Sequence, residues 1–261
     1  MQNKGLIFVV ILFFIGSLFA QNNDEFLRRQ FIKGKDTLNY RVLYPEKFSK
    51  AEVYPLVLFL HGSGERGSDN VKQLLHGSRL FLDPVTRKTH PAIVIFPQCP
   101  QNEYWANMNV DRSTKPISRK FPSELEPTKP LHLVMSLLDE FTNKPYIKKA
   151  QVYVGGLSMG SMGTFELLSR KPKLFAAAFA ICGGGNLALA EKYAKNTEMW
   201  IFHGANDNVV DPQLSIDIVS SIIRFGGKPN FTLYGQANHN SWDAAFAEPE
   251  LLSWLFSKIK H

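Results

Sequence analysis

The sequence predicts an α/β fold, a mostly parallel central sheet with helices on both faces. First, short runs of β-branched and aromatic residues alternate along the chain with segments of helical periodicity. Second, several of these runs are continuously apolar, which is typical of parallel strands covered on both faces. Third, roughly 240 residues follow the N-terminal segment, which suits one domain with a substantial core.

The expected elements follow one another in a regular order. Residues 26–33 and 37–44 predict an opening hairpin around a Lys-Gly-Lys-Asp turn. Further strands are expected at 55–60, 92–96, 151–154, 175–181, 198–202 and 230–234. Helices are expected near 131–142, 158–170, 213–225 and 249–259. The segment 101–130, rich in Asn, Pro, Lys and Ser and without a clear period, is expected to overhang the functional site as a long loop.

The first 20 residues have the features of a signal peptide. Lys4 supplies a short positive region, and residues 6–15 form an apolar run that is short for a membrane span. Cleavage is expected after Ala20, which leaves residues 21–261 as a single domain that is exported to the periplasm or secreted. An uncleaved membrane anchor is the alternative.

Charge, cysteines and histidines argue against several classes of site. The net charge of +7 is spread along the chain in short groups, which indicates a solvated surface and not a nucleic-acid interface. Cys99 and Cys182 follow different predicted strands, so two free, buried thiols are favoured over a bridge. The histidines lack H-x-H and H-E-x-x-H spacing, so no metal site is expected.

The most informative motif is the G-x-S-x-G pattern of residues 156–160. It lies between a predicted strand and a predicted helix, where a sharp turn pushes Ser158 outward. Gly156 and Gly160 stand where a Cβ would collide with neighbouring backbone. This context predicts a nucleophile elbow with Ser158 as the nucleophile.

A catalytic acid and base follow Ser158 in the expected chain order. Asp207 comes just after the predicted strand 198–202, and His239 comes just after the predicted strand 230–234. A serine hydroxyl needs a base to accept its proton, and a histidine, which titrates near neutral pH, can do so. The carboxylate then orients the imidazole and stabilises its charged form.

Other residues compete for these roles. Asp211 precedes Pro212 and a helical run, so it is interpreted as a helix cap. Asp243 follows the histidine, out of order, and can also cap a turn. His203, at a strand exit, is interpreted as a structural histidine, and His61 is expected to brace the loop that follows strand 55–60.

That glycine-rich loop, residues 61–67, is expected to complete an oxyanion hole. The predicted donors are the backbone amides of Met159 and Ser63, with Gly64 as the alternative to Ser63. Glu65 and Arg66 are expected to pin the loop, with Arg66 in a salt bridge.

Trp105 and Trp242 lie in predicted loops near the site. One of them is expected to form a wall of the acyl or alcohol pocket, where flat apolar surface is useful. Ordinary core packing is the alternative for both.

Taken together, the motifs resemble those of α/β-hydrolase esterases in the phospholipase/carboxylesterase and polyhydroxybutyrate-depolymerase-like group, which borders the feruloyl and acetylxylan esterases. The matching segments are 61–67, 96–100, 156–160, 181–185, 203–207 and 239–243. The resemblance implies cofactor-free hydrolysis of carboxylic esters, small or polysaccharide-linked, by Ser158, His239 and Asp207. Two departures, Ser161 and Asn238, stand where such proteins often have glycine.

Two other functions remain open on the sequence. A serine peptidase of the prolyl-oligopeptidase type uses the same triad and fold but usually carries a propeller, which nothing in this sequence predicts. A non-catalytic binding protein of the same fold is expected to lose triad residues, whereas all three candidates are present here.

Overall fold

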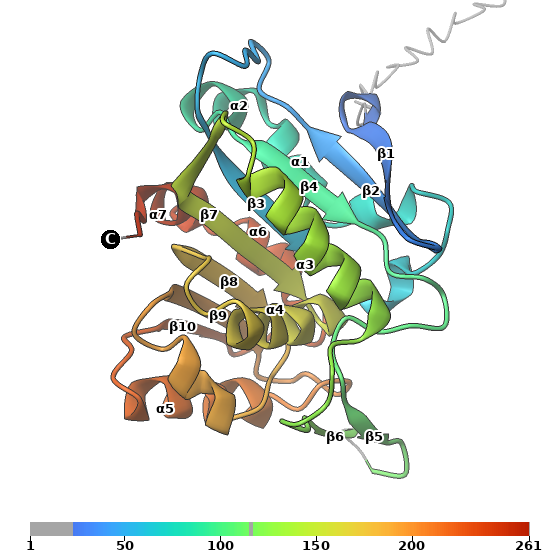
Figure 1. The fold of residues 1–261 in the computed structure, drawn as a ribbon. Helices are drawn as coiled ribbons and strands as arrows, with labels where there is room; N and C mark the ends of the chain where they lie inside the picture. Colours follow the sequence, from blue (N-terminus) through green and yellow to red (C-terminus); the bar gives the residue numbers. More distant parts are fainter. Residues whose placement is uncertain (1–22, 115–116, 261) are drawn as a thin grey trace, which may run out of the picture.

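The central feature of the molecule is an eight-stranded sheet with the order β1-β2-β4-β3-β7-β8-β9-β10 (Figure 1). It comes from a computed structural model, which describes residues 23–114 and 117–260. The predicted signal peptide therefore lies outside the described residues. The strands of the sheet are β1 (Leu27–Lys33), β2 (Asp36–Leu43), β3 (Tyr54–Leu60), β4 (Ile93–Pro97), β7 (Ile147–Leu157), β8 (Ala177–Ile181), β9 (Glu198–Gly204) and β10 (Asn230–Tyr234).

Most neighbouring strands run parallel. The hairpin of β1 and β2 is antiparallel, and β2 pairs antiparallel with β4. Every other neighbouring pair, from β4 through β3 and β7 to β10, is parallel. The carboxyl ends of the parallel strands therefore meet at one edge of the sheet, where ligands bind in open α/β folds.

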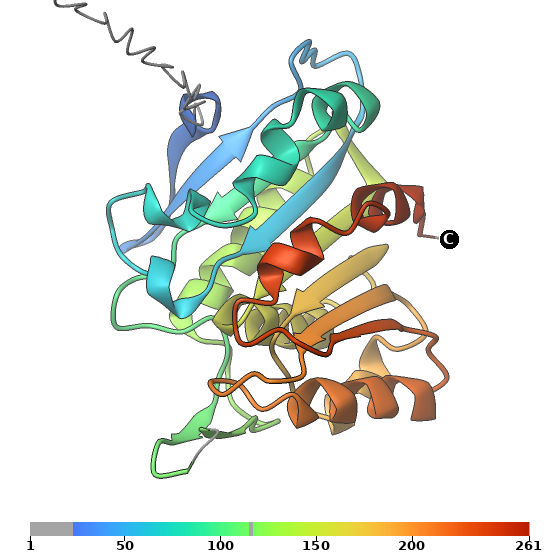
Figure 2. The same cartoon turned by 180° about the vertical axis from the view of Figure 1, so that it is seen from behind.

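Helices cover both faces of the sheet. One face carries α3 (Lys129–Thr142), α4 (Met159–Arg170) and α5 (Gln213–Arg224) (Figure 1). The other face carries α1 (Ser78–Leu82), α2 (Pro84–Thr89), α6 (Trp242–Phe246) and α7 (Leu251–Ser257) (Figure 2). The predicted α/β architecture is thereby confirmed.

Strand β3 shows why its apolar run is continuous. Leu56, Leu58 and Leu60 pack into the core on the α3 and α4 side, while Val57 and Phe59 pack into the core on the α6 and α7 side. All five side chains have no exposed surface. Because successive side chains point to opposite faces, a strand buried on both sides needs apolar residues at every position.

The structure also contains short elements that the sequence analysis missed. These are α1, α2 and α6, together with a two-stranded hairpin of β5 (Asn109–Asp111) and β6 (Ser118–Lys120). None exceeds six residues, so none is long enough to establish a periodic pattern. The hairpin lies within the segment 101–130 and projects from the edge where the parallel strands end (Figure 1).

Among the described residues, no helix is both long and apolar enough to cross a membrane.

The first turn of α4 packs so closely on the end of β3 that Gly160 tolerates no side chain. A Cβ at Gly160 would collide with the backbone carbonyls of Leu60 and His61. We expect Gly160→Ala to lower the free energy of unfolding by about 3 kcal/mol or more, since overpacking against rigid backbone forces the elements apart.

Chemical denaturation measures this effect. The matched control is Gly235→Ala, because a Cβ at Gly235 meets nothing within 4 Å. Equal stability of the two variants would contradict the close packing.

Candidate active site

Ser158 occupies the sharp turn between β7 and α4. Its backbone has φ 51° and ψ −117°, a conformation that non-glycine residues rarely adopt. A hydrogen bond of 2.8 Å from the Ser158 amide to the Ile181 carbonyl holds the turn against β8. Strain of this kind is common where a fold presents a reactive side chain.

Glycines make room for the turn. A Cβ at Gly156 would collide with the Gly160 carbonyl, which matches the reason for expecting glycine there. Gly183 likewise accommodates the departure at Ser161, because a Cβ at Gly183 would meet the Ser161 side chain. The elbow therefore keeps its shape although Ser161 is not glycine.

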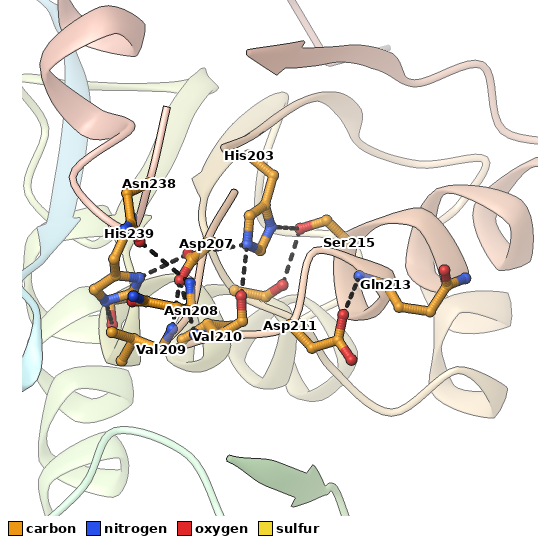
Figure 3. Close-up of polar contacts among 12 residues, drawn as sticks. His203, Asp207, Asn208, Val209, Val210, Asp211, Gln213, Ser215, Asn238 and His239 are labelled. Atoms are coloured by element: carbon orange, nitrogen blue, oxygen red, sulfur yellow. Dashed lines mark hydrogen bonds and ion pairs between the residues drawn. The ribbon is translucent and has the colours of Figure 1, made fainter. Parts of the chain in front are cut away.

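Ser158, His239 and Asp207 form a continuous hydrogen-bonded series. The Ser158 hydroxyl lies 3.0 Å from His239 Nε2. His239 Nδ1 lies 2.7 Å from Asp207 Oδ2 (Figure 3). This order of contacts lets Nε2 accept the serine proton while Nδ1–H donates to the carboxylate. The structure thus brings together the three residues singled out from the sequence.

The Asp207 carboxylate is held by donors on both oxygens. Oδ1 accepts from the amides of Val209 and Val210, each at 2.9 Å, and Oδ2 accepts from His239 and His203. Burial by itself would raise the pKa of Asp207, but the hydrogen bonds from the two histidines and two amides outweigh it and hold the pKa well below its usual range. Asp207 is therefore ionised at neutral pH.

His203 has a structural position, as predicted. Its side chain is fully buried, with Nε2 3.2 Å from Asp207 Oδ2 and Nδ1 2.7 Å from the Ser215 hydroxyl (Figure 3). The Ser215 hydroxyl also lies 2.9 Å from the Gly183 carbonyl oxygen. His203 thus ties the acid to α5 on the side away from His239.

Asn238, the second residue that stands where similar proteins often have glycine, joins the loops that carry Asp207 and His239. Its side-chain oxygen accepts from the backbone amides of His239 at 2.7 Å and Asn208 at 3.2 Å. A glycine at this position would lack both bonds. A Cβ at the neighbouring Gly204 would collide with the backbone carbonyls of residues 237 and 238, so glycine there lets the two loops meet.

The two carboxylates that compete with Asp207 for the role of catalytic acid make other contacts. Asp211 Oδ1 accepts from the Gln213 amide at 2.9 Å, at the start of α5, which supports its interpretation as a cap (Figure 3). Asp243 lies in the first turn of α6 and contacts Asn240. Neither Asp211 nor Asp243 forms a hydrogen bond or ion pair with His239 in the described part of the chain.

The amides proposed for the oxyanion hole face a shared cavity. Ser63, Ser158 and Met159 all line a cavity of about 230 Å³. Neither the Ser63 nor the Met159 amide has a hydrogen-bond partner within the described part of the chain. Gly64 is not among the residues that line this cavity, which favours Ser63 over Gly64.

His61 and Trp105 lie beneath the loop. His61 Nδ1–H donates to the Gly62 carbonyl at 2.6 Å, and its Nε2 accepts from the Cys99 amide at 3.0 Å. The Trp105 indole N–H donates to the His61 carbonyl at 3.1 Å, and the Trp105 side chain is fully buried. His61 therefore braces the loop as expected, whereas Trp105 supports it from below and does not line the cavity as a wall.

Glu65 and Arg66 pin the loop in different ways. Arg66 Nε donates to the Ser63 carbonyl at 2.9 Å, and its Nη1 donates to the Glu103 carbonyl at 3.3 Å. Glu65 is buried with Oε1 3.9 Å from His76 Nε2, and burial raises the pKa of its carboxyl group. The expected Arg66 salt bridge is absent among the described residues, because its partners are backbone carbonyls.

Trp242 lies beside the base. Its ring is 5.3 Å from the His239 ring in an edge-to-face arrangement and 5.3 Å from the His76 ring. Like Trp105, Trp242 does not line the cavity of Ser158, and its contact with a substrate stays a prediction.

Cys182, Asp207 and His239 lie close enough together to be considered as ligands of a metal ion. One ligand atom from each falls within 4.8 Å of the others. His239 Nδ1 and Asp207 Oδ2 are, however, already hydrogen bonded to each other, and burial raises the pKa of the Cys182 thiol, which disfavours the thiolate that a metal requires. Cys99 and Cys182 are both buried and free, as predicted.

A larger cavity lies apart from the nucleophile. It measures about 610 Å³ and is lined by residues of α1 and α6, including Phe246, and by His76 just before α1. Ser158 does not line it, so the smaller cavity is the one relevant to chemistry at the serine.

Fold and site together define an α/β-hydrolase. The phospholipase/carboxylesterase family matches residues 47–249, and the chain belongs to this family. The resemblance drawn from the motifs is thereby confirmed.

Solved structures and a curated relative agree with this assignment. A thermostable esterase is 33% identical over 91% of this chain and 64% of its own chain, with a TM-score of 0.80. A ferulic acid esterase from Anaeromyces mucronatus is 15% identical over 89% of this chain and 90% of its own, with a TM-score of 0.64, which shows the fold alone. A bifunctional acetylxylan esterase/xylanase from Neocallimastix patriciarum is 32% identical over 90 residues, which are 34% of this chain and 13% of that enzyme.

His61 links the stability of the site to pH. Burial lowers the pKa of His61 from 6.5 to about 4, so between these values the unfolded chain binds a proton that the folded chain does not. The free energy of unfolding therefore decreases as the pH falls from 6.5 to about 4, and His61 alone accounts for about 3 kcal/mol of this decrease.

We expect His61→Gln to show a shallower loss of unfolding free energy between pH 6.5 and pH 4 than the wild type, since glutamine does not titrate. Denaturant titrations of both proteins across this range measure the difference. Parallel pH profiles would contradict the buried neutral state of His61.

Proposed function

We propose that the protein is a serine esterase that hydrolyses carboxylic esters through an acyl-enzyme, with Ser158 as nucleophile, His239 as base and Asp207 as the orienting acid. The observation that carries the proposal is the unbroken series of contacts from the Ser158 hydroxyl to the Asp207 carboxylate, beside a cavity lined by Ser63 and Met159.

Each step of the proposed ester hydrolysis is assigned to a named atom of the site. His239 Nε2 accepts the proton as Ser158 Oγ attacks the ester carbonyl carbon, and the ionised Asp207 stabilises the imidazolium. The amides of Ser63 and Met159 donate to the oxyanion of the tetrahedral intermediate. His239 then gives its proton to the leaving alcohol, and water, deprotonated by the same nitrogen, releases the acid.

The relatives support a substrate class. A bifunctional acetylxylan esterase/xylanase is 32% identical over 34% of this chain, so we propose acyl or feruloyl esters linked to carbohydrate as substrates. The predicted signal peptide of the first 20 residues places this activity outside the cytoplasm after export. Peptidases such as the Porphyromonas gingivalis dipeptidyl peptidase share the fold at 13% identity, and this chain covers 36% of that chain. That likeness shows the fold alone, whereas the phospholipase/carboxylesterase family and the thermostable esterase at 33% identity favour an esterase.

The first test concerns the nucleophile. Ser158→Ala is expected to reduce kcat on para-nitrophenyl acetate by roughly four to six orders of magnitude while the fold is retained, because triad residues act as a unit. A fluorophosphonate probe, followed by peptide mapping, is expected to label Ser158 in the wild type. Labelling at another residue, or an active Ser158→Ala enzyme, would exclude the assignment.

The second test distinguishes between two carboxylates four residues apart in the chain. Asp207→Asn is expected to reduce kcat by roughly 10⁴-fold, because an amide does not hold the required histidine tautomer. Asp211→Asn is the matched control and is expected to cost about 1 kcal/mol of stability or less, through its contact with the Gln213 amide. A larger loss of kcat in the Asp211 variant would mean that Asp207 is not the acid.

A further inference from the structure

Three arginines surround the cavity that contains Ser158. Arg66 comes from the loop after β3, Arg112 from the turn after β5, and Arg119 from β6. The other lining residues are two serines and uncharged side chains, and no aspartate or glutamate of the described chain lines this cavity. A cleft lined by charges of one sign attracts the opposite charge.

Arg66 is held in place by two hydrogen bonds and still has N–H groups that can donate to a ligand. Its Nε and Nη1 donate to the carbonyls of Ser63 and Glu103, and its guanidinium carbon lies 4.9 Å from the centre of the Tyr104 ring. Nη2 has no hydrogen-bond partner in the described residues. The guanidinium is thus oriented beside the oxyanion loop before any ligand arrives.

Arg119, from the hairpin, is held in a similar way. Its Nη1 donates to the carbonyls of Ile117 at 2.9 Å and Val209 at 2.8 Å, which ties the hairpin to the loop of Asp207. Nε and Nη2 have no partner within the described ranges. Burial lowers the pKa of Arg119, the charge of Arg112 lowers it further, and the charge of Asp207 acts in the opposite direction, so Arg119 lies near both groups.

Two carboxylates near the cavity are hydrogen bonded to other groups. Asp207 is buried and bonded on both oxygens, although its charge also acts on Arg119, and Asp111 accepts from Ser113. Arg112 is exposed and has no ion pair with a described residue. Three guanidinium groups around one small cavity repel one another, so a bound anion would relieve an unfavourable arrangement.

We propose that this cavity binds an anionic group, and that the preferred substrates are esters that carry a carboxylate or a similar anion in the acyl or the alcohol part. The proposal rests on the proposed function of Ser158 as the nucleophile. A guanidinium presents donors in a planar fork that matches a carboxylate. The volume of about 230 Å³ suits one compact group.

Two pairs of esters test the proposal, each with a charged and a neutral member of similar shape. The para-nitrophenyl ester of adipic acid and its terminal monoamide place the charge in the acyl part. Para-acetoxybenzoate and para-acetoxybenzamide place it in the alcohol part. We expect kcat/KM to favour the anion at least about tenfold in one or both pairs at low salt, and the preference to shrink at about 1 M salt, where charges are screened beyond ~3 Å.

Variants assign the preference to the arginines. Arg112→Gln and Arg119→Gln are each expected to lower the anion-to-neutral ratio of kcat/KM by about tenfold or less, with the larger loss in the double variant. Because the ratio is the readout, a change common to both esters cancels. Lys120→Gln is the matched control, since it removes a charge from β6 at a residue that does not line the cavity.

Three outcomes would overturn the proposal: a ratio near one in both pairs, a ratio unchanged in the arginine variants, or an equal drop in the Lys120 control. In each case Ser158-dependent hydrolysis of the neutral esters would still support the proposed function. Loss of that function would appear differently, as turnover of all four esters that persists in Ser158→Ala.

Discussion

Close packing of the first turn of α4 on the end of β3 is the constraint on which the site depends. Gly160 places α4 against the carbonyls of Leu60 and His61, from which the oxyanion loop begins. The nucleophile and the amide of Ser63 therefore reach the same cavity from two different elements. Because the contact is between backbones, no side-chain rearrangement can replace it.

The Asp207 carboxylate organises the other half of the site. Two backbone amides and two histidines bond to it, so its charge is kept in a buried position where an isolated carboxylate would be unstable. His203, at the end of β9, links Asp207 to Ser215 of α5, while His239 connects Asp207 to Ser158. Asn238 then joins the two loops through backbone amides, which fixes the distance between acid and base.

The hairpin of β5 and β6 adds a layer that differs in character from the elements beneath it. The sheet and α4 provide buried, uncharged surroundings, whereas the hairpin contributes Arg112 and Arg119 to the lining of the cavity. A hydrogen bond from Arg119 to the Val209 carbonyl attaches the hairpin to the loop of Asp207. Under the proposals made here, the groups that carry the chemistry and most of those that recognise the anion lie on separate segments, as is common where loops sit on a rigid scaffold.

The sequence by itself determined the alternating strands and helices, the elbow at Ser158, and the order in which Asp207 and His239 follow it. These features are local, since a strand buried on both faces needs a continuous apolar run and a sharp turn needs Gly156 and Gly160. The free state of Cys99 and Cys182 and the bracing role of His61 were also predicted, each from its place at a strand end.

Only the tertiary structure decided what depends on contacts between distant segments. It placed Trp105 under the loop and Trp242 beside His239, gave Arg66 carbonyl partners in place of a salt bridge, and gathered three arginines from separate segments. A helix of five residues is little more than one turn and a strand of three residues shows almost no alternation, so the sequence did not predict α6 or the β5–β6 hairpin. Burial and proximity arise from packing of the whole chain, and no short stretch of sequence encodes them.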